Sequence, residues 1–87
     1  MSIFDPMWMK TKVIEGMIES LKDKDEDRNL RIQSAMTLGK TLRVKGADQG
    51  VLEARAVKAL TEALKDEDEK LREAARKALE MIKAKKS

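Results

Sequence analysis

The sequence predicts an all-α protein: four helices that form two helical hairpins stacked as an α-α superhelix. Three observations lead to this prediction. Apolar residues recur at helical spacing in four segments of the chain. The composition has only 2% aromatic residues and one Pro, and it is rich in the helix formers Ala, Leu, Lys and Glu. The second half of the chain also repeats the first with a period near 40 residues, which is typical of helical solenoids.

Residues 51–84 form the clearer of the two repeated units. Helices are expected over 51–65 and 69–84, with a short acidic turn between them. Leu71 and Leu79 lie on the apolar stripe of the second helix, and both are expected to be among the most buried residues. The positions of this unit assigned to the core are Ala56, Val57, Leu60, Ala63, Leu64, Leu71, Ala74, Ala75, Ala78, Leu79 and Ile82.

Residues 6–45 form the earlier unit, with helices expected over 6–22 and 28–45. Asp5 followed by Pro6 is a helix-start signal, with Asp as the N-cap and Pro at the first helical position. The core positions assigned to the first helix are Val13, Ile14, Met17, Ile18 and Leu21, and Gly16 among them is expected to mark a close contact between helices.

The two units align, but the offset between matching residues changes after the turn. The offset is 43 residues up to the turn and 41 residues in the second helix, so the first turn carries two extra residues. Asp27 and Asp68 each stand three residues before the first core leucine of a second helix, which suits an N-cap. The matching segments are LKDKDE at 21–26 with LKDEDE at 64–69, and LRIQSAMTLG at 30–39 with LREAARKALE at 71–80.

The pattern A-V-x-x-L-x-x-x-L-x-D-x-D-x-x-L-R-x-x-A-x-x-x-A-L resembles a HEAT repeat, specifically the short HEAT-like type of the phycobilisome lyases, which is common in archaeal and bacterial proteins. The match is close over 56–82 and looser over 13–42, where Gln33, Ser34 and Thr37 replace the expected alanines. This resemblance implies an α-α superhelix that serves as a scaffold for binding other proteins, and it implies no particular partner.

The resemblance also implies that turn aspartates pair with the arginine that opens each second helix. We expect these groups to cap helices and to bridge the repeats rather than to bind a ligand. The acidic first turn lacks the central Gly and the terminal Glu of a calcium loop, so no metal site is predicted there. The pairs implied by position are Asp66 or Asp68 with Arg72, and Asp23, Asp25 or Asp27 with Arg31.

The outer faces of the two second helices differ. The earlier helix carries Ile32, Ala35, Met36 and Gly39 where the later helix carries charged residues. In a stacked array an inner repeat is covered on its forward side, whereas the last repeat exposes that side to water. Residues 51–84 therefore fit a C-terminal cap repeat. The charged counterparts are Glu73, Arg76, Lys77 and Glu80.

The N-terminal end of the first unit is unusually apolar and contains the only Phe and the only Trp of the chain. Two interpretations follow. This segment folds over the first repeat as its N-terminal cap, or it forms a surface that binds a partner or a second copy. The residues predicted to contact a partner are Phe4, Met7, Trp8, Ile18, Ile32 and Met36.

Length and composition exclude several functional classes. A chain of 87 residues predicts a single domain over 1–87. The absence of His and Cys removes the usual general base and the thiolate metal ligands, so the protein is predicted to be no enzyme and to have no catalytic residue, cofactor or metal. No apolar stretch is long enough to form a membrane span or a signal peptide, and a cytoplasmic protein is expected.

The leading hypothesis is a non-enzymatic interaction module of HEAT-like repeats that holds a protein partner or associates with itself. The alternative is binding of a nucleic-acid backbone by basic residues of the second helices, and the interleaved glutamates and the lack of aromatic residues for stacking beyond Trp8 argue against it. An enzyme related to the bilin lyases is disfavoured because no pair of nucleophile and base is visible. The basic residues of the alternative are Arg31, Arg43, Lys45, Arg72, Arg76 and Lys83.

Overall fold

The structure, a computed structural model, describes residues 6–43 and 50–84, with side chains from Thr11 onward. Those residues form four helices and no strand, which confirms the all-α prediction. The first hairpin consists of α1 (Pro6–Lys22) and α2 (Arg28–Leu42), and the second hairpin consists of α3 (Val51–Ala63) and α4 (Glu69–Ala84).

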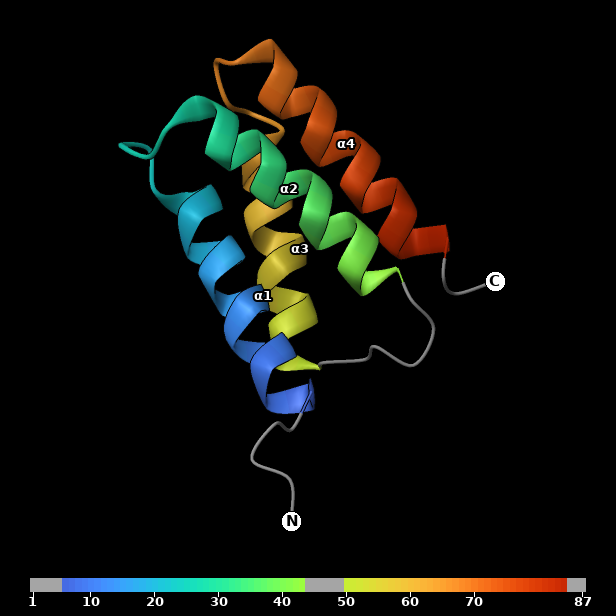
Figure 1. Cartoon of the computed structure of the whole chain (residues 1–87). Helices are drawn as coiled ribbons and strands as arrows, with labels where there is room; N and C mark the ends of the chain where they lie inside the picture. Colours follow the sequence, from blue (N-terminus) through green and yellow to red (C-terminus); the bar gives the residue numbers. More distant parts are fainter. Residues whose placement is uncertain (1–5, 44–49, 85–87) are drawn as a thin grey trace.

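The two hairpins lie side by side and form two layers of helices (Figure 1). α1 packs along α3 in one layer, and α2 packs along α4 in the other. Each helix therefore contacts its counterpart in the other hairpin as well as its own antiparallel partner. This is the stacking expected of an α-α superhelix, in which each repeat contacts its neighbour in the same way.

Both second helices begin at the predicted aspartate caps. Asp27 accepts a hydrogen bond through Oδ2 from the backbone N–H of Leu30 at 3.2 Å. Asp68 accepts through Oδ1 from the N–H groups of Lys70 and Leu71, at 2.8 and 3.3 Å. Each carboxylate therefore satisfies backbone donors that the first turn of a helix leaves without an intrahelical partner.

The last turns of α2 and α3 end earlier than the sequence predicts. α2 ends at Leu42, with Arg43 at its C-cap, and the rest of the turn predicted there lies outside the described residues. α3 ends at Ala63 because the chain tightens to a three-residue spacing, in which the N–H of Lys65 donates to the carbonyl of Glu62 at 3.0 Å. Both differences are at helix ends, where hydrogen bonds of four-residue and three-residue spacing compete within a single turn.

The core lies between the layers and draws apolar residues from all four helices. Most of the positions that the periodicity assigns to the core are buried, and small alanines contribute to it more than large residues in the second hairpin. The buried apolar residues are Ile14, Ile18, Leu21, Ala35, Leu38, Leu42, Leu52, Ala56, Ala59, Leu60, Ala63, Leu71, Ala74, Ala75, Ala78 and Ile82.

Five large residues assigned to the core are less buried than predicted, and two of them, Met17 and Val57, are partly buried and pack against the core. Val13 and Leu64 expose 54% and 37% of their surface, and Leu79 is only half-buried. Leu71, by contrast, is buried as predicted. The predictions for Val13, Leu64 and Leu79 are therefore wrong. Helical periodicity identifies an apolar stripe, but it does not say which edge of that stripe a neighbouring hairpin will cover.

The two hairpins approach closely at Gly39 of α2. A Cβ atom at this position would lie 2.7 Å from the Cα and 2.8 Å from the Cβ of Ala78, so a larger residue does not fit without a shift of the backbone. Gly16, which was expected to mark a close contact, has no neighbour within 4 Å of such a Cβ atom. That expectation is wrong, and Gly39 is the glycine that the packing requires.

Replacement of the two glycines by alanine should change stability in opposite directions. Gly16→Ala should raise the free energy of unfolding by about 1 kcal/mol, because alanine favours the helix and meets no obstacle. Gly39→Ala should lower it by up to about 2 kcal/mol, because the overlap with Ala78 outweighs the same gain. Urea denaturation followed by circular dichroism measures both values, and two effects of the same sign would contradict the close contact.

Candidate functional site

The residues predicted to contact a partner lie in different settings. Ile18 is fully buried in the core and therefore lies on no free surface. Ile32 and Met36 are half-buried and pack against the core between the hairpins. These three residues therefore serve the packing of the two hairpins. The other predicted residues, Phe4 and the side chains of Met7 and Trp8, lie outside the described part of the chain.

We call the side of the first hairpin that meets the second hairpin its front face, and we apply the same name to the equivalent positions of the second hairpin. Ile18 and Ala35 are buried on the front face of the first hairpin, whereas their counterparts Thr61 and Arg76 are exposed. The front face of the second hairpin is mostly polar, and its described residues are Val57, Thr61, Leu64, Glu73, Arg76, Lys77, Leu79, Glu80 and Lys83.

This comparison explains why two leucines are more exposed than predicted. Leu64 and Leu79 are the counterparts of Leu21 and Leu38, which the second hairpin covers. No further hairpin follows among the described residues, so both remain in contact with water. Three of the five charged residues on this face form ion pairs with one another, because Arg76 lies 3.0 Å from Glu80 and 3.4 Å from Glu73.

The opposite side of each hairpin is its rear face. In the second hairpin the rear face packs on the first hairpin, and Ala56 and Leu71 are buried there. Their counterparts in the first hairpin, Val13 and Leu30, expose 54% and 42% of their surface. The described rear face of the first hairpin consists of Val13, Gly16, Met17, Ser20, Leu30, Gln33, Ser34, Thr37 and Thr41, which correspond to Ala56, Ala59, Leu60, Ala63, Leu71, Ala74, Ala75, Ala78 and Ile82.

The rear face of the first hairpin carries no charge at any of these nine positions, although 40% of the residues of the chain are charged. An uncharged surface with exposed large apolar side chains is a candidate for binding another macromolecule. The sequence-based prediction omits Val13 and Leu30 from the contact residues. The lack of charge at all nine aligned positions is the signal that identifies them.

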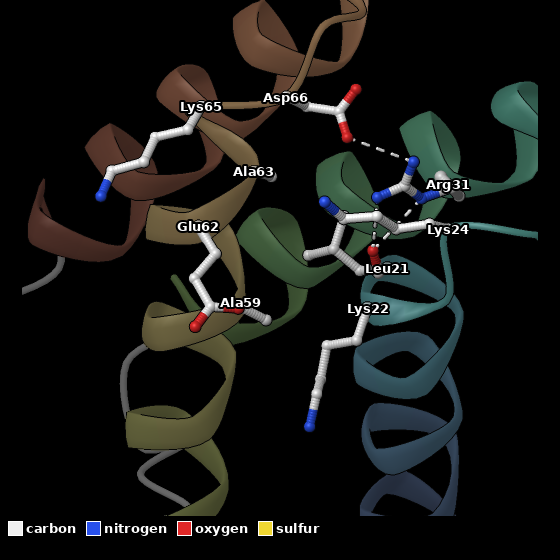
Figure 2. A pocket seen from close by; sticks show the side chains of 9 residues that line it. All are labelled: Leu21, Lys22, Lys24, Arg31, Ala59, Glu62, Ala63, Lys65 and Asp66. Atoms are coloured by element: carbon white, nitrogen blue, oxygen red, sulfur yellow. Dashed lines mark hydrogen bonds and ion pairs between the residues drawn. The ribbon is translucent and has the colours of Figure 1, made fainter.

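Arg31 connects the two hairpins beside their turns (Figure 2). Its Nε and Nη2 atoms donate to the carbonyl oxygen of Leu21 at 3.2 and 3.0 Å. Its Nη1 atom lies 3.3 Å from Oδ2 of Asp66, and both side chains are largely shielded from water. A guanidinium group withdrawn from water requires such partners, so Arg31 fixes the end of α1 against the turn of the second hairpin.

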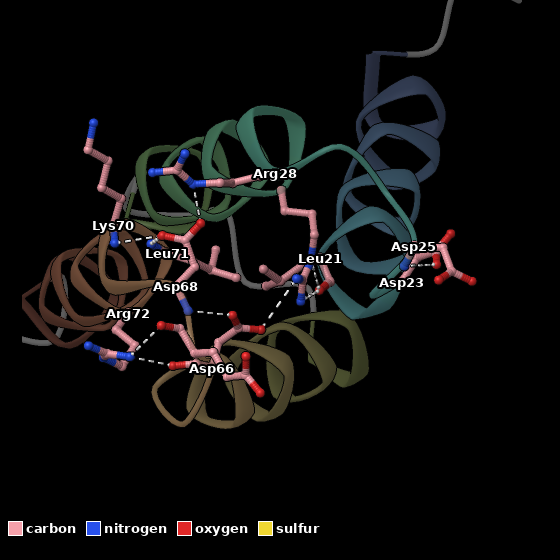
Figure 3. A network of polar contacts seen from close by, with 11 residues as sticks. Leu21, Asp23, Asp25, Arg28, Asp66, Asp68, Lys70, Leu71 and Arg72 are labelled. Carbon is pink, nitrogen blue, oxygen red and sulfur yellow. Dashed lines mark hydrogen bonds and ion pairs between the residues drawn. The ribbon is translucent and has the colours of Figure 1, made fainter.

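The aspartate–arginine pairs cross between the hairpins instead of forming within each unit. Arg31 pairs with Asp66, and Arg28 pairs with Asp68 in the contact that Figure 3 shows. Arg72 has no carboxylate partner among the described residues, and its Nη1 atom donates to the backbone carbonyl of Asp66 at 2.6 Å. The expected bridging of the repeats is therefore confirmed, whereas the partners predicted for Arg31 and Arg72 are wrong.

Asp23 is the counterpart of Asp66 in the first turn. In each residue Oδ1 accepts the backbone N–H found two positions later, that of Asp25 or Asp68, at 2.9 Å. The second carboxylate oxygen of Asp66 meets Arg31, whereas that of Asp23 has no hydrogen-bond or ion-pair partner among the described residues. By equivalence, Asp23 offers this oxygen on the rear side of the first hairpin.

The described residues show neither a metal site nor a membrane helix. No group of three or more His, Cys, Asp or Glu in residues 6–43 and 50–84 is placed to hold a metal ion. No helix in these ranges has the length and apolar character that a membrane crossing requires.

Comparison with known proteins gives a family match that covers both hairpins. A family model described as HEAT repeats matches residues 14–87. No curated protein and no solved structure matches the chain. The likeness therefore concerns the repeat itself, and the fold described above has the paired helices that such a repeat implies.

Removal of the Arg31 side chain should destabilise the protein more than removal of its counterpart Arg72. Arg31→Ala leaves Asp66 and the Leu21 carbonyl without their shared donor, and we expect a loss of about 3 kcal/mol. Arg72→Ala frees carbonyls that water can reach, and its cost should stay near 1 kcal/mol. Chemical denaturation of both variants provides the comparison, and equal losses would argue against a bridging role specific to Arg31.

The contribution of Asp68 to stability should depend on pH. Burial by itself would raise its pKa, but the N–H groups of Leu71 and Lys70, together with Arg28, favour the carboxylate and hold the pKa below the ordinary value of 3.8. A carboxyl group with a lowered folded pKa stabilises the protein at higher pH and loses this contribution as the pH falls through the folded pKa.

Asp68→Asn is the variant that measures this contribution, since Asn can still cap α4. The difference in the free energy of unfolding between the native chain and this variant should be largest near neutral pH. It should shrink as the pH falls from about 5 to about 2 in urea titrations. A difference that stays constant over this range would show that the charge of Asp68 is unimportant.

Proposed function

Because this chain belongs to the family of HEAT repeats, we propose that it is a non-enzymatic protein-interaction module whose docking surface is the rear face of the first hairpin. The observation that carries this proposal is the contrast between the two ends. The front face of the second hairpin carries five charged residues, three of which pair with one another, whereas the rear face of the first hairpin is uncharged and exposes Val13 and Leu30. The period of about 42 residues supports assignment to the short HEAT-like type.

The occupant that fits this surface is an α-helical hairpin of a partner protein. The second hairpin provides the comparison, because its rear face is covered by a hairpin that contributes apolar residues and two arginines, Arg28 and Arg31. The rear face of the first hairpin offers the same arrangement: apolar side chains at Val13, Met17 and Leu30, and an open carboxylate oxygen at Asp23. A partner with an arginine at the start of its second helix would complete both sets of contacts.

The apolar N-terminal segment adjoins this face in the sequence, because it leads directly into α1. We propose that Phe4, Met7 and Trp8 extend the docking surface at the N-terminal end of α1.

A second copy of the chain is the other occupant to consider. Stacking of one copy behind another would place Glu80 against Thr37, because their counterparts Gly39 and Ala78 are in contact, and burial of such charges at an uncharged surface is costly. Packing of two rear faces would avoid this cost. Light scattering at several concentrations detects it: a dimer that Val13→Glu dissociates would make the second copy the occupant in place of a partner hairpin.

Nucleic-acid binding by the second helices has little support in the side-chain arrangement. Arg76 is paired with two glutamates, and Arg31 is buried in its contact with Asp66. Arg72 is directed to backbone carbonyls of the turn. Three of the basic residues in this alternative are therefore already used within the protein, and Lys45 lies outside the described residues.

A chain with an additional repeat tests the docking surface directly. Residues 8–50 span one period, so a second copy of this segment inserted before Trp8 places a new front face, with its own Arg31, behind the original first hairpin. We expect the free energy of unfolding to rise by about 3 kcal/mol, since Val13 and Leu30 would each gain about 1.5 kcal/mol from complete burial. Urea denaturation of the two chains gives the difference.

The matched control carries Val13→Glu and Leu30→Glu in the downstream copy only. These substitutions should cancel the gain in the longer chain and should have little effect in the native chain, where both side chains are exposed. An unchanged stability of the longer chain, or an equal gain in the control, would contradict a docking surface at the rear face.

A further inference from the structure

Two adjoining cavities form a groove between α1 and α3. Their volumes are about 280 and 300 Å³, and Lys22, Ala59 and Glu62 line both of them. Figure 2 shows the part beside the turns, with Lys22 on the side of α1 and Glu62 and Lys65 on the side of α3. We call this feature the α1–α3 groove.

The groove has an apolar floor because α3 presents small residues toward α1. Ala59 and Ala63 contribute only methyl groups, which leave space above the helix surface. Ile18 and Leu21 of α1 supply the rest of the floor, and both belong to the core. The groove can therefore receive apolar side chains without the displacement of any polar group.

The rim of the groove is strongly basic. Lys22, Lys24, Lys58 and Lys65 line it and are exposed, and their side chains have no hydrogen-bond or ion-pair partner among the described residues. Two other cations of the lining are already paired, Arg31 with Asp66 and Arg55 with Glu19 at 3.5 Å. Glu62 is the one lining carboxylate that has no ion-pair partner among the described residues.

Four ammonium groups around a low-dielectric floor, with a single carboxylate between them, create a positive potential that attracts anionic groups. We propose that the α1–α3 groove binds an acidic segment of a partner protein in which carboxylates alternate with apolar side chains. In an extended segment alternate side chains point to opposite sides. Apolar side chains of such a segment reach the floor at Ala59, while its carboxylates remain at the level of the lysine ammonium groups.

A polypeptide fits this groove better than a nucleic acid does. A phosphate backbone has no apolar groups to place on Ala59 and Ala63. None of the residues that line the groove is aromatic, so a base would have no ring there on which to stack. The groove is separate from the rear face of the first hairpin. The proposal for the groove therefore rests on the cavity and its charges and not on the docking of a hairpin.

The test uses the full chain and a short fluorescein-labelled peptide of alternating glutamate and leucine, with fluorescence anisotropy as the measurement. Peptide affinity should fall as salt is raised. The double variant Lys22→Glu, Lys58→Glu should weaken binding by about tenfold or more. The matched control Lys40→Glu, Lys77→Glu changes the net charge equally at exposed positions outside the groove and should leave the affinity nearly unchanged.

Two further probes separate the possible outcomes. Glu62→Gln should strengthen binding, by roughly twofold or more, because it removes the opposing carboxylate. A glutamine–leucine peptide should bind much more weakly than the glutamate–leucine peptide. Equal weakening by both double variants, equal binding of both peptides, or no binding at low salt would overturn the proposal. Tighter binding of single-stranded oligothymidine, lost in the same groove variant, would replace the acidic segment by a nucleic acid. Circular dichroism melts would show that each variant is folded.

Discussion

The contact between Gly39 of α2 and Ala78 of α4 sets the distance between the two hairpins, and the rest of the packing depends on that distance. With no side chain to separate them at this point, the second helices of the two hairpins lie close together, and alanines suffice to fill the interface. The same proximity removes water from the surroundings of Arg31. Its guanidinium group must then find partners within the protein, which it does at Leu21 and Asp66.

Features that depend on neighbouring residues in the sequence could be predicted, and features that depend on stacking could not. The caps Asp27 and Asp68 follow from a backbone relation over three residues, so the sequence alone places them. The choice of Asp66 as the partner of Arg31 is made by the position of the second hairpin, and no local pattern distinguishes it from Asp23. For the same reason, periodicity predicts the apolar stripe that contains Leu79 but not the edge of it that stays exposed.

Part of the candidate site was also accessible from the sequence, because the internal repeat provides a reference for each position. Burial of Ala56 and Leu71 in the second hairpin indicates what Val13 and Leu30 would experience if a hairpin were stacked behind the first one. The α1–α3 groove was not accessible in this way. It depends on the space that Ala59 leaves and on the convergence of lysines from two helices, and neither follows from spacing along the chain. The contributions of Phe4, Met7 and Trp8 stay predictions.

Arg31 also determines how the two hairpins share their stability. Its donors are satisfied only when the end of α1 and the turn after α3 are both in place, so neither hairpin reaches its full free energy of folding alone. In an array of repeats, such a contact contributes to the interface between neighbouring repeats and not to the intrinsic stability of either repeat. A state with one hairpin folded and the other open would lose the contact between Arg31 and Asp66 and would expose the apolar residues between the hairpins to water. We therefore expect the chain to unfold as one cooperative unit in spite of its modular sequence, because loss of order at either turn removes contacts of the other hairpin.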